Sequence, residues 1–302
     1  LKGFSSFISK FDGKAATIDD FIETIFETDK AIKTEKFKIW YKQNGTPKLT
    51  FKRYWDRNSK VLKIHISQNN IKKNPINKLP LVIPINLAVF TDKNNFKKIK
   101  FILEKENDEI FIKNINTTLD KPITSYMRRF SAPVKWETDL SLDEELFILE
   151  NEKDYFSIYD SASRIYEIII LERAKGNALI NSEDKLIKVF KSLLIYKKFN
   201  LSLLSEILNT PSFAEIESSS NFIDPQNIFK VIDELNRKFS KELKDELIHK
   251  FNSIESNFYQ IWPKGKDERK LIKVIWKLLL FCNDASIRKR ILNFVDNRNM
   301  TL

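Results

Sequence analysis

The feature that most constrains the fold is a change in the spacing of apolar residues along the chain. From residue 47 to about residue 130, apolar side chains recur at every second position in short runs, as in β-strands with one buried face. From about residue 140 onward the spacing is that of amphipathic helices. A strand region followed by a helix region, rather than an alternation of the two, predicts separate all-β and all-α domains.

The residues before the first strand are expected to be helical. Thr17, followed by Asp19 and Asp20, places a capping oxygen and acidic side chains at a helix start. A second short helix is predicted over residues 34–43. It should end at Gly45, because glycine can adopt the left-handed conformation that closes a helix.

The strand region predicts an antiparallel sandwich. Leu49, Phe51 and Trp55 alternate with polar residues, and after a turn at residues 56–59 a second alternating run covers residues 62–66. Further runs lie at residues 81–90, 98–103, 109–113 and 123–130. About seven short strands without helices between them indicate an Ig-like antiparallel β-sandwich.

The region from residue 140 predicts an all-α domain. Helices are expected at residues 154–172, 182–197 (capped by Ser182), 267–282 and 285–296, and one long helix should begin at Asp224-Pro225. That long helix carries an apolar stripe from Ile228 to Phe258. Successive helices joined by short turns predict a solenoid-like stack of helix pairs, although no strict sequence repeat is present.

Composition narrows the functional classes. The net charge is +11, but the lysines are dispersed and usually stand beside acidic residues. This pattern favours an AT-rich coding sequence, which adds Lys, Asn and Ile everywhere, over a nucleic-acid site. The single cysteine, Cys282, excludes an internal disulfide, fits a reducing compartment and is expected to be an ordinary buried thiol. No apolar run is long enough to span a bilayer, so no membrane partner is expected.

No residue of the chain is predicted to be catalytic, cofactor-binding or metal-binding. The two histidines, His65 and His249, fall on the polar face of a strand and on a helix of another domain, which is a poor arrangement for a metal site. The acidic run at residues 143–145 is expected to begin a helix, where acids oppose the dipole. The serines at residues 218–220 are expected to form a loop with no nucleophile motif.

Four stretches of sequence carry a resemblance to a known family. They are D-G-K-A-A-T-I-D-D-F at residues 12–21, W-Y-K-Q-N-G-T-P at 40–47, R-F-S-A-P-V-K at 129–135, and T-P-S at 210–212 with I-D-P at 223–225. In this order the stretches resemble the bacterial aminopeptidase N-type zinc metallopeptidases (gluzincin alanyl aminopeptidases). The trio Asn299-Met300-Thr301 resembles a further segment of that family, with Arg298 in place of an asparagine.

The resemblance implies a domain organisation. Residues 1–45 would be the last helices of a catalytic domain, residues 46–139 the Ig-like sandwich, and residues 140–302 the first part of a longer helical domain. The family cleaves N-terminal residues from peptides with zinc held by H-E-x-x-H and a later glutamate, a motif this sequence lacks. The chain is therefore expected to hold no zinc and to be inactive alone.

The implied partners are the upstream catalytic domain of the same polypeptide and the peptide substrates of the parent enzyme, in the cytoplasm. The chain would brace the catalytic domain and restrict access to its site. Two alternatives stay open. One is a stand-alone sandwich-plus-solenoid module that binds a protein or peptide. The other is a nucleic-acid-binding protein that uses Tyr54, Phe111 and Tyr126 on the strands as stacking platforms.

Overall fold

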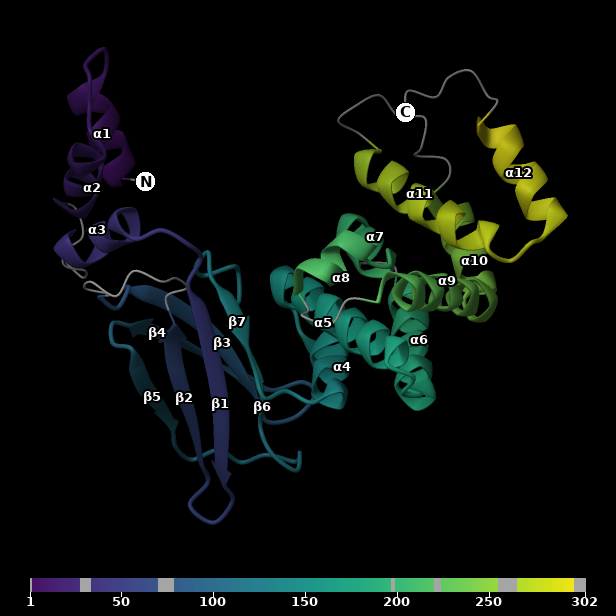
Figure 1. Cartoon of the computed structure of the whole chain (residues 1–302), viewed down its shortest axis with the longest axis horizontal. Coiled ribbons are helices and arrows are strands. Elements are labelled where there is room, and N and C mark those ends of the chain that lie inside the picture. The colour runs from purple at the N-terminus through teal and green to yellow at the C-terminus, as the bar shows by residue number, and fades with distance from the viewer. Residues whose placement is uncertain are drawn as a thin grey trace. The chain divides into compact units, whose positions relative to one another are not determined.

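The computed structural model describes residues 2–27, 34–69, 79–196, 199–219, 224–254 and 265–295. The chain divides into two compact units, Leu1–Asp139 and Leu140–Leu302. Figure 1 shows strands in the first unit and only helices in the second. The multidomain fold class predicted from the change of apolar spacing is therefore confirmed.

The first unit opens with three short helices, α1 (Lys2–Phe11), α2 (Ile18–Glu27) and α3 (Thr34–Lys42). The predicted start of α2 is present, since the Asp20 amide donates to Thr17 Oγ1 at 3.1 Å and the Asp20 carboxylate accepts from the Thr17 amide at 2.8 Å. Gly45 has a φ of +92°, as the predicted helix stop requires. The indole N–H of Trp40 donates to the carbonyl of Val82 at 2.9 Å, which fastens α3 to the strand region.

The strand region is a sandwich of two sheets. Its strands are β1 (Lys48–Asp56), β2 (Val61–Asn69), β3 (Ile83–Phe90), β4 (Phe96–Leu103), β5 (Asn107–Ile112), β6 (Ile123–Ser125) and β7 (Lys135–Glu137). One sheet has the order β5-β2-β1-β7 and the other β4-β3-β6. Neighbours are antiparallel except for β1 and β7, which run parallel.

The core of the sandwich lies between the two sheets. The fully buried inner positions alternate along each strand and include Leu49, Phe51, Ile64, Ile85 and Leu87. The ring of Phe51, on β1, stacks on Tyr126, which follows β6 in the other sheet, with ring centroids 4.4 Å apart. This cross-sheet contact buries the apolar face that the period of two predicts.

Two expectations for the sandwich are wrong. The run at residues 123–130 is a strand only over β6, because Met127, Arg129 and Phe130 all have positive φ values, which no strand can contain. Tyr126 is 4% exposed, so it offers no stacking platform. The short strand β7 was not anticipated. It exists because three residues pair with β1, so tertiary contact rather than sequence pattern creates it.

The second unit consists of helices in the part of the chain that the structure describes. They are α4 (Leu142–Asn151), α5 (Tyr155–Ala174), α6 (Ile180–Ile195), α7 (Leu201–Leu208), α8 (Phe213–Ser219), α9 (Pro225–Glu242), α10 (Lys244–Ile254), α11 (Lys266–Leu280) and α12 (Ala285–Val295). The acidic run at residues 143–145 starts α4 as predicted, and Ser141 and Glu144 form a capping box there. Asp224 caps α9 and Pro225 occupies its first turn.

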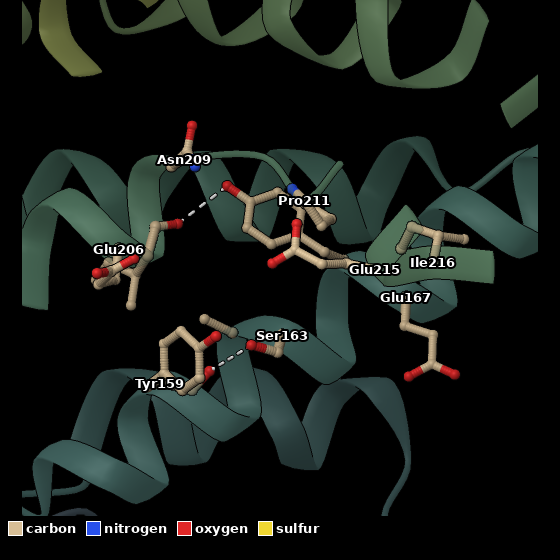
Figure 2. Close-up of a pocket in the computed structure, with 11 residues that line it drawn as sticks. Tyr159, Ser163, Glu167, Glu206, Asn209, Pro211, Glu215 and Ile216 are labelled. Atoms are coloured by element: carbon tan, nitrogen blue, oxygen red, sulfur yellow. Dashed lines mark hydrogen bonds between the residues drawn. The ribbon is translucent and has the colours of Figure 1, made fainter. Parts of the chain in front are cut away.

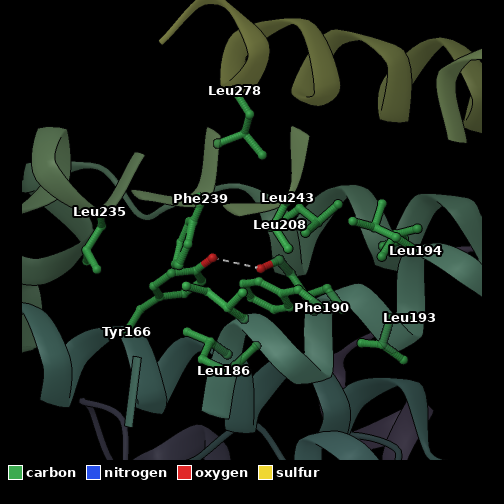
Figure 3. Close-up of a cluster of buried hydrophobic side chains, with 14 of the residues drawn as sticks. Tyr166, Leu186, Phe190, Leu193, Leu194, Leu208, Leu235, Phe239, Leu243 and Leu278 are labelled. Carbon is green, nitrogen blue, oxygen red and sulfur yellow. Dashed lines mark hydrogen bonds between the residues drawn. The ribbon is translucent and has the colours of Figure 1, made fainter. Parts of the chain in front are cut away.

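One continuous hydrophobic core joins these helices. At its centre lie Tyr166, Phe190 and Phe239, from α5, α6 and α9 (Figure 3). The ring centroids of Phe190 and Phe239 are 5.6 Å apart in an edge-to-face arrangement. The hydroxyl of Tyr166 donates to the carbonyl of Ile207 at 3.0 Å, so the one polar atom of this aromatic group is satisfied inside the core.

Several helix predictions need correction. α6 begins at Ile180, with no side-chain cap from Ser182, because Leu179 packs against the core and sets the start. The predicted long helix is in fact two helices, α9 and α10, separated at Leu243, which has φ −106° and ψ 6°. The apolar stripe is buried in both helices. Phe258 lies outside the described residues. Residues 218 and 219 belong to α8 rather than to a loop, and α7 and α8 were not anticipated.

None of the described helices combines the length and the apolarity needed to cross a bilayer.

Candidate functional site

The structure places the two histidines in separate units. His65 lies on the outer face of β2, with Nδ1 3.6 Å from Glu109 Oε1, and His249 is exposed on α10. Within the described ranges, no three His, Cys, Asp or Glu side chains gather closely enough to hold a metal ion. The described His, Cys, Asp and Glu residues therefore do not fit the zinc site of the family that the sequence resembles.

Cys282 follows α11 and is half-buried rather than fully buried. Its thiol donates to the carbonyl of Ser240 at 3.0 Å, and its Sγ lies 2.8 Å from Ser240 Oγ. These two contacts occupy the thiol in joining the end of α11 to the end of α9. The arrangement is structural, because both contacts tie the thiol to Ser240.

The helical unit has a hollow of about 240 Å³ between α5 and the segment from the end of α7 to α8. From α5 come Tyr159, Ala162, Ser163, Tyr166 and Glu167; from the other side come Glu206, Ile207, Asn209, Pro211, Glu215 and Ile216. We call it the acidic hollow, because three carboxylates and no basic side chain line it. Figure 2 shows those carboxylates around the opening, with Tyr159 and Ser163 on the α5 side.

Neighbouring residues keep the acidic hollow charged. The Ser212 amide and hydroxyl both donate to Glu215 Oε2 at 2.7 Å, and these hydrogen bonds hold the pKa of Glu215 below its ordinary value. Glu206 is ion-paired with Lys270, whose side chain is 42% exposed. Burial lowers the pKa of Lys277, which donates to Asn209 Oδ1 at 2.8 Å at the border of the hollow. Each carboxylate has a cation nearby, with Lys270 at Glu206, Lys277 at Glu215 and Arg164 at Glu167, but none of these cations lines the hollow.

The chemistry that this lining supports is binding rather than catalysis. Carboxylates beside an exposed tyrosine ring suit an ammonium or guanidinium group, which can use both charge and the aromatic face. The hydroxyl of Ser163 donates to the Tyr159 carbonyl at 3.0 Å, within its own helix, so it is not poised as a nucleophile. The acidic lining therefore suits a basic side chain or a peptide amine better than an anion.

Sequence reasoning missed this site because its residues come from two segments, 159–167 and 206–216, that lie far apart in the chain. One signal was present in the T-P-S stretch at residues 210–212. Thr210 donates to Asn236 Oδ1 at 3.1 Å in the core, Pro211 lines the hollow, and Ser212 orients Glu215. A stretch that carries the family resemblance therefore forms part of the hollow and orients one of its carboxylates.

Two family models match the chain. Residues 142–302 match "Domain of unknown function (DUF3458_C) ARM repeats", and residues 45–139 match "Domain of unknown function (DUF3458) Ig-like fold". The first match covers more than half of the chain. Both agree with the fold described above, an Ig-like sandwich followed by a helical repeat domain.

Curated relatives include two bacterial proteins named aminopeptidase N. That of Escherichia coli is 26% identical over 290 residues, which cover 93% of this chain and 33% of that protein. That of Haemophilus influenzae is 27% identical over 274 residues, which cover 86% of this chain and 31% of that protein. The chain therefore spans about a third of the length of these relatives, which are homologous to it along most of its sequence.

A solved structure shares the fold of this chain. The crystal structure of Legionella pneumophila aminopeptidase A, in complex with aspartic acid, superposes with a TM-score of 0.84 at 22% sequence identity. The match covers 98% of this chain and 35% of that protein. At this identity the likeness establishes the fold of the chain.

Proposed function

This chain belongs to the family described as DUF3458_C, ARM repeats, and we propose that it is the non-catalytic C-terminal portion of a zinc-dependent aminopeptidase. The observation that carries the proposal is the long match to aminopeptidase N, 93% of this chain against 33% of the Escherichia coli protein. The matching order of Ig-like and helical domains supports it. The parent enzyme would remove N-terminal residues from peptides.

In this proposal the metal belongs to a catalytic domain that precedes the chain in the same polypeptide. The described residues hold no trio of metal ligands, and the two histidines lie in different units. No step of the reaction is assigned to these residues. The domain boundaries at residues 45/46 and 139/140 are part of the same proposal.

The role proposed for the chain is to brace the catalytic domain and to restrict access to its site. The helical unit suits this role because one hydrophobic core runs through it, and a close-packed core resists deformation. The acidic hollow adds a chemical preference, since its carboxylates attract the ammonium group or basic side chains of an arriving peptide. Peptides, rather than nucleic acids or membranes, are therefore the proposed ligands.

A cytoplasmic location completes the proposal. The single cysteine is held by Ser240 rather than by a disulfide, and such a chain suits a reducing compartment.

The proposal is tested by reading the gene upstream of Leu1 and then assaying two proteins. We expect an in-frame H-E-x-x-H followed by a glutamate. The longer polypeptide should hydrolyse alanyl or leucyl anilides in a chelator-sensitive manner, and the 302-residue chain should not.

Either of two results would overturn the proposal. One is chelator-sensitive anilide hydrolysis by the 302-residue chain itself. The other is an upstream sequence with no zinc motif, in which case the chain is a stand-alone binding module. As a control, anilide hydrolysis by the longer polypeptide is also measured with an equimolar amount of the 302-residue chain present, which shows whether the chain inhibits the assay.

A further inference from the structure

The first unit contains a second cavity, of about 510 Å³, lined by residues of the turn from β1 to β2 and of the segment after β5. Figure 1 shows that turn at the end of the two strands. One wall comes from the hairpin, with Trp55, Arg57 and Lys60, and the other from residues 115–120, which follow β5. We call it the hairpin cavity. Its volume falls in the range typical of small-molecule sites, about 300–1,000 Å³.

Trp55 lines the hairpin cavity at the end of the sandwich. The inward-facing row of β1 runs Phe51, Arg53, Trp55, so the indole lies where the core meets the open end of the sandwich. Its Nε1–H is buried and has no hydrogen-bond acceptor among the described residues. Because this atom is closed to water, a ligand in the cavity would meet the indole ring rather than its N–H.

Arg57 and Lys60 place two positive charges at the mouth of the cavity. Arg57 Nη2 donates to the backbone carbonyl of Asp120 at 2.9 Å, and Lys60 Nζ donates to Asn116 Oδ1 at 2.8 Å. These contacts fix both cations but neutralise neither, and neither cation has an ion-pair partner within the described residues. Lys60 has a φ of +54°, and its carbonyl accepts from the Ile115 amide, so the hairpin is held in place against the opposite wall.

The rest of the lining adds donors and an apolar surface. The amide nitrogen of Asn116 and the hydroxyl of Thr118 have no bond within the described residues, while Thr117 is occupied by the Thr91 carbonyl at 2.7 Å. Ile115 and Leu119 are apolar. Asp120 is the one acidic residue of the lining, against two cations. The cavity is therefore rich in donors, positive on balance, and aromatic on one side.

We propose that the hairpin cavity binds a small organic anion, with its carboxylate or phosphate group on Arg57 and Lys60 and its apolar or aromatic body against Trp55. A guanidinium presents a planar pair of donors that matches either anion, and the ammonium adds a point charge. The indole ring adds a broad apolar surface for the body of the ligand. This site is independent of the proposed peptidase role.

The test follows the indole N–H resonance of Trp55 in the 302-residue chain by two-dimensional NMR, assigned with the Trp55→Phe variant. Benzoate and phenyl phosphate are the anionic probes, and benzamide is the neutral match to benzoate. We expect both anions to shift the Trp55 resonance saturably, with a Kd on the order of 1 mM. Benzamide should bind at least about tenfold more weakly. The tighter of the two anions identifies the source as a carboxylate or a phosphate ester.

A matched pair of double variants decides whether the cavity is responsible. Arg57→Gln with Lys60→Gln removes the two charges, while the new side-chain amide at position 60 can still donate to Asn116, and it should weaken anion binding at least about tenfold. Lys97→Gln with Lys100→Gln removes two exposed charges from β4 of the same sandwich and should leave binding unchanged. Unshifted resonances of the other four tryptophans in both proteins show that the fold is kept.

The proposal is overturned by any of three results. These are no saturable shift with either anion, equal binding of benzamide and benzoate, or the same loss of affinity in both double variants.

Discussion

The side chain and the backbone of Arg53 both bind the carboxylate of Asp139. Arg53 Nε donates to Oδ1 at 2.8 Å and the Arg53 amide donates to Oδ2 at 3.0 Å. The guanidinium also donates to the carbonyl of Pro122 at 3.3 Å, and its side chain is only 2% exposed. A charged residue thus occupies an inward position of β1, and the residue that satisfies it is the last of the first unit.

Asp139→Ala should destabilise the sandwich by about 3 kcal/mol, because it leaves a buried guanidinium without its counter-charge. The measurement is the urea midpoint of the sandwich, followed by tryptophan fluorescence. Glu109→Ala is the control, because it removes a carboxylate whose partner Lys63 is 35% exposed, and it should change stability by less than about 1 kcal/mol. Equal losses in the two variants would contradict this account of Asp139.

Ser141→Ala should destabilise the helical unit by about 1 kcal/mol. Ser141 Oγ accepts from the Glu144 amide at 3.3 Å, and Glu144 accepts from the Ser141 amide at 2.8 Å, so the substitution breaks one half of a capping box. Ser163→Ala, at an exposed position inside α5, should be neutral or slightly stabilising. Thermal unfolding followed by far-UV circular dichroism compares the two, and a cap effect predicts a lower Tm for Ser141→Ala alone.

The aromatic centre of the helical unit should be the most sensitive part of its core. Phe239→Ala should cost about 3–5 kcal/mol, because Phe239 is fully buried between two other rings. Tyr166→Phe should cost only about 1 kcal/mol, the value of its hydrogen bond to Ile207. Ile195→Ala, at a side chain 61% exposed, is the control and should change stability by less than about 0.5 kcal/mol. A different ranking in urea unfolding would show that the core is centred elsewhere.

The stability of the α10–α12 region should decrease at low pH because Asp284 becomes protonated. Hydrogen bonds from the Ser286 hydroxyl and amide, together with Lys244 at 2.9 Å, hold the pKa of Asp284 below its ordinary value. A carboxyl group whose pKa is lower in the folded than in the unfolded chain stabilises the fold above the unfolded pKa. That contribution should therefore be lost progressively as the pH falls below about 4.

Asp284→Asn should flatten this acid dependence. The measurement is the urea midpoint at neutral pH and at successively lower pH values in both proteins. The variant should begin less stable and then lose less on acidification than the native chain. Parallel pH profiles in the two proteins would exclude Asp284 as a source of the acid sensitivity.

The acidic hollow should contribute to peptide preference in the longer polypeptide. Glu167→Gln with Glu206→Gln should raise KM for peptides with basic residues roughly fivefold and leave kcat unchanged, since the loss is in binding rather than in the chemical step. Glu150→Gln with Glu242→Gln removes two exposed acids of the same unit outside the hollow. If both double variants raise KM equally, the effect is one of net charge and the hollow has no specific role.

Much of the fold could be predicted because local sequence dictates it. The start of α2 follows from Thr17 and Asp20, the stop after α3 from Gly45, and the opening of α9 from Asp224-Pro225, and each is present. The predictions that failed depended on distant partners. Residues 127–130 belong to a run that was expected to be one strand, yet positive φ values at Met127, Arg129 and Phe130 end β6 before them. β7 forms because its three residues pair with β1 at the edge of the sheet.

The same division holds for the sites. The sequence alone indicated separate all-β and all-α parts, a family resemblance and the absence of an H-E-x-x-H motif, because periodicity, capping and motifs are properties of neighbouring residues. It placed neither the acidic hollow nor the hairpin cavity. Glu167 and Glu215, or Trp55 and Thr118, are far apart in the chain and carry no local signal of proximity. Only tertiary packing brings them together, because it alone decides which side chains share a cavity and which buried donor is left without an acceptor.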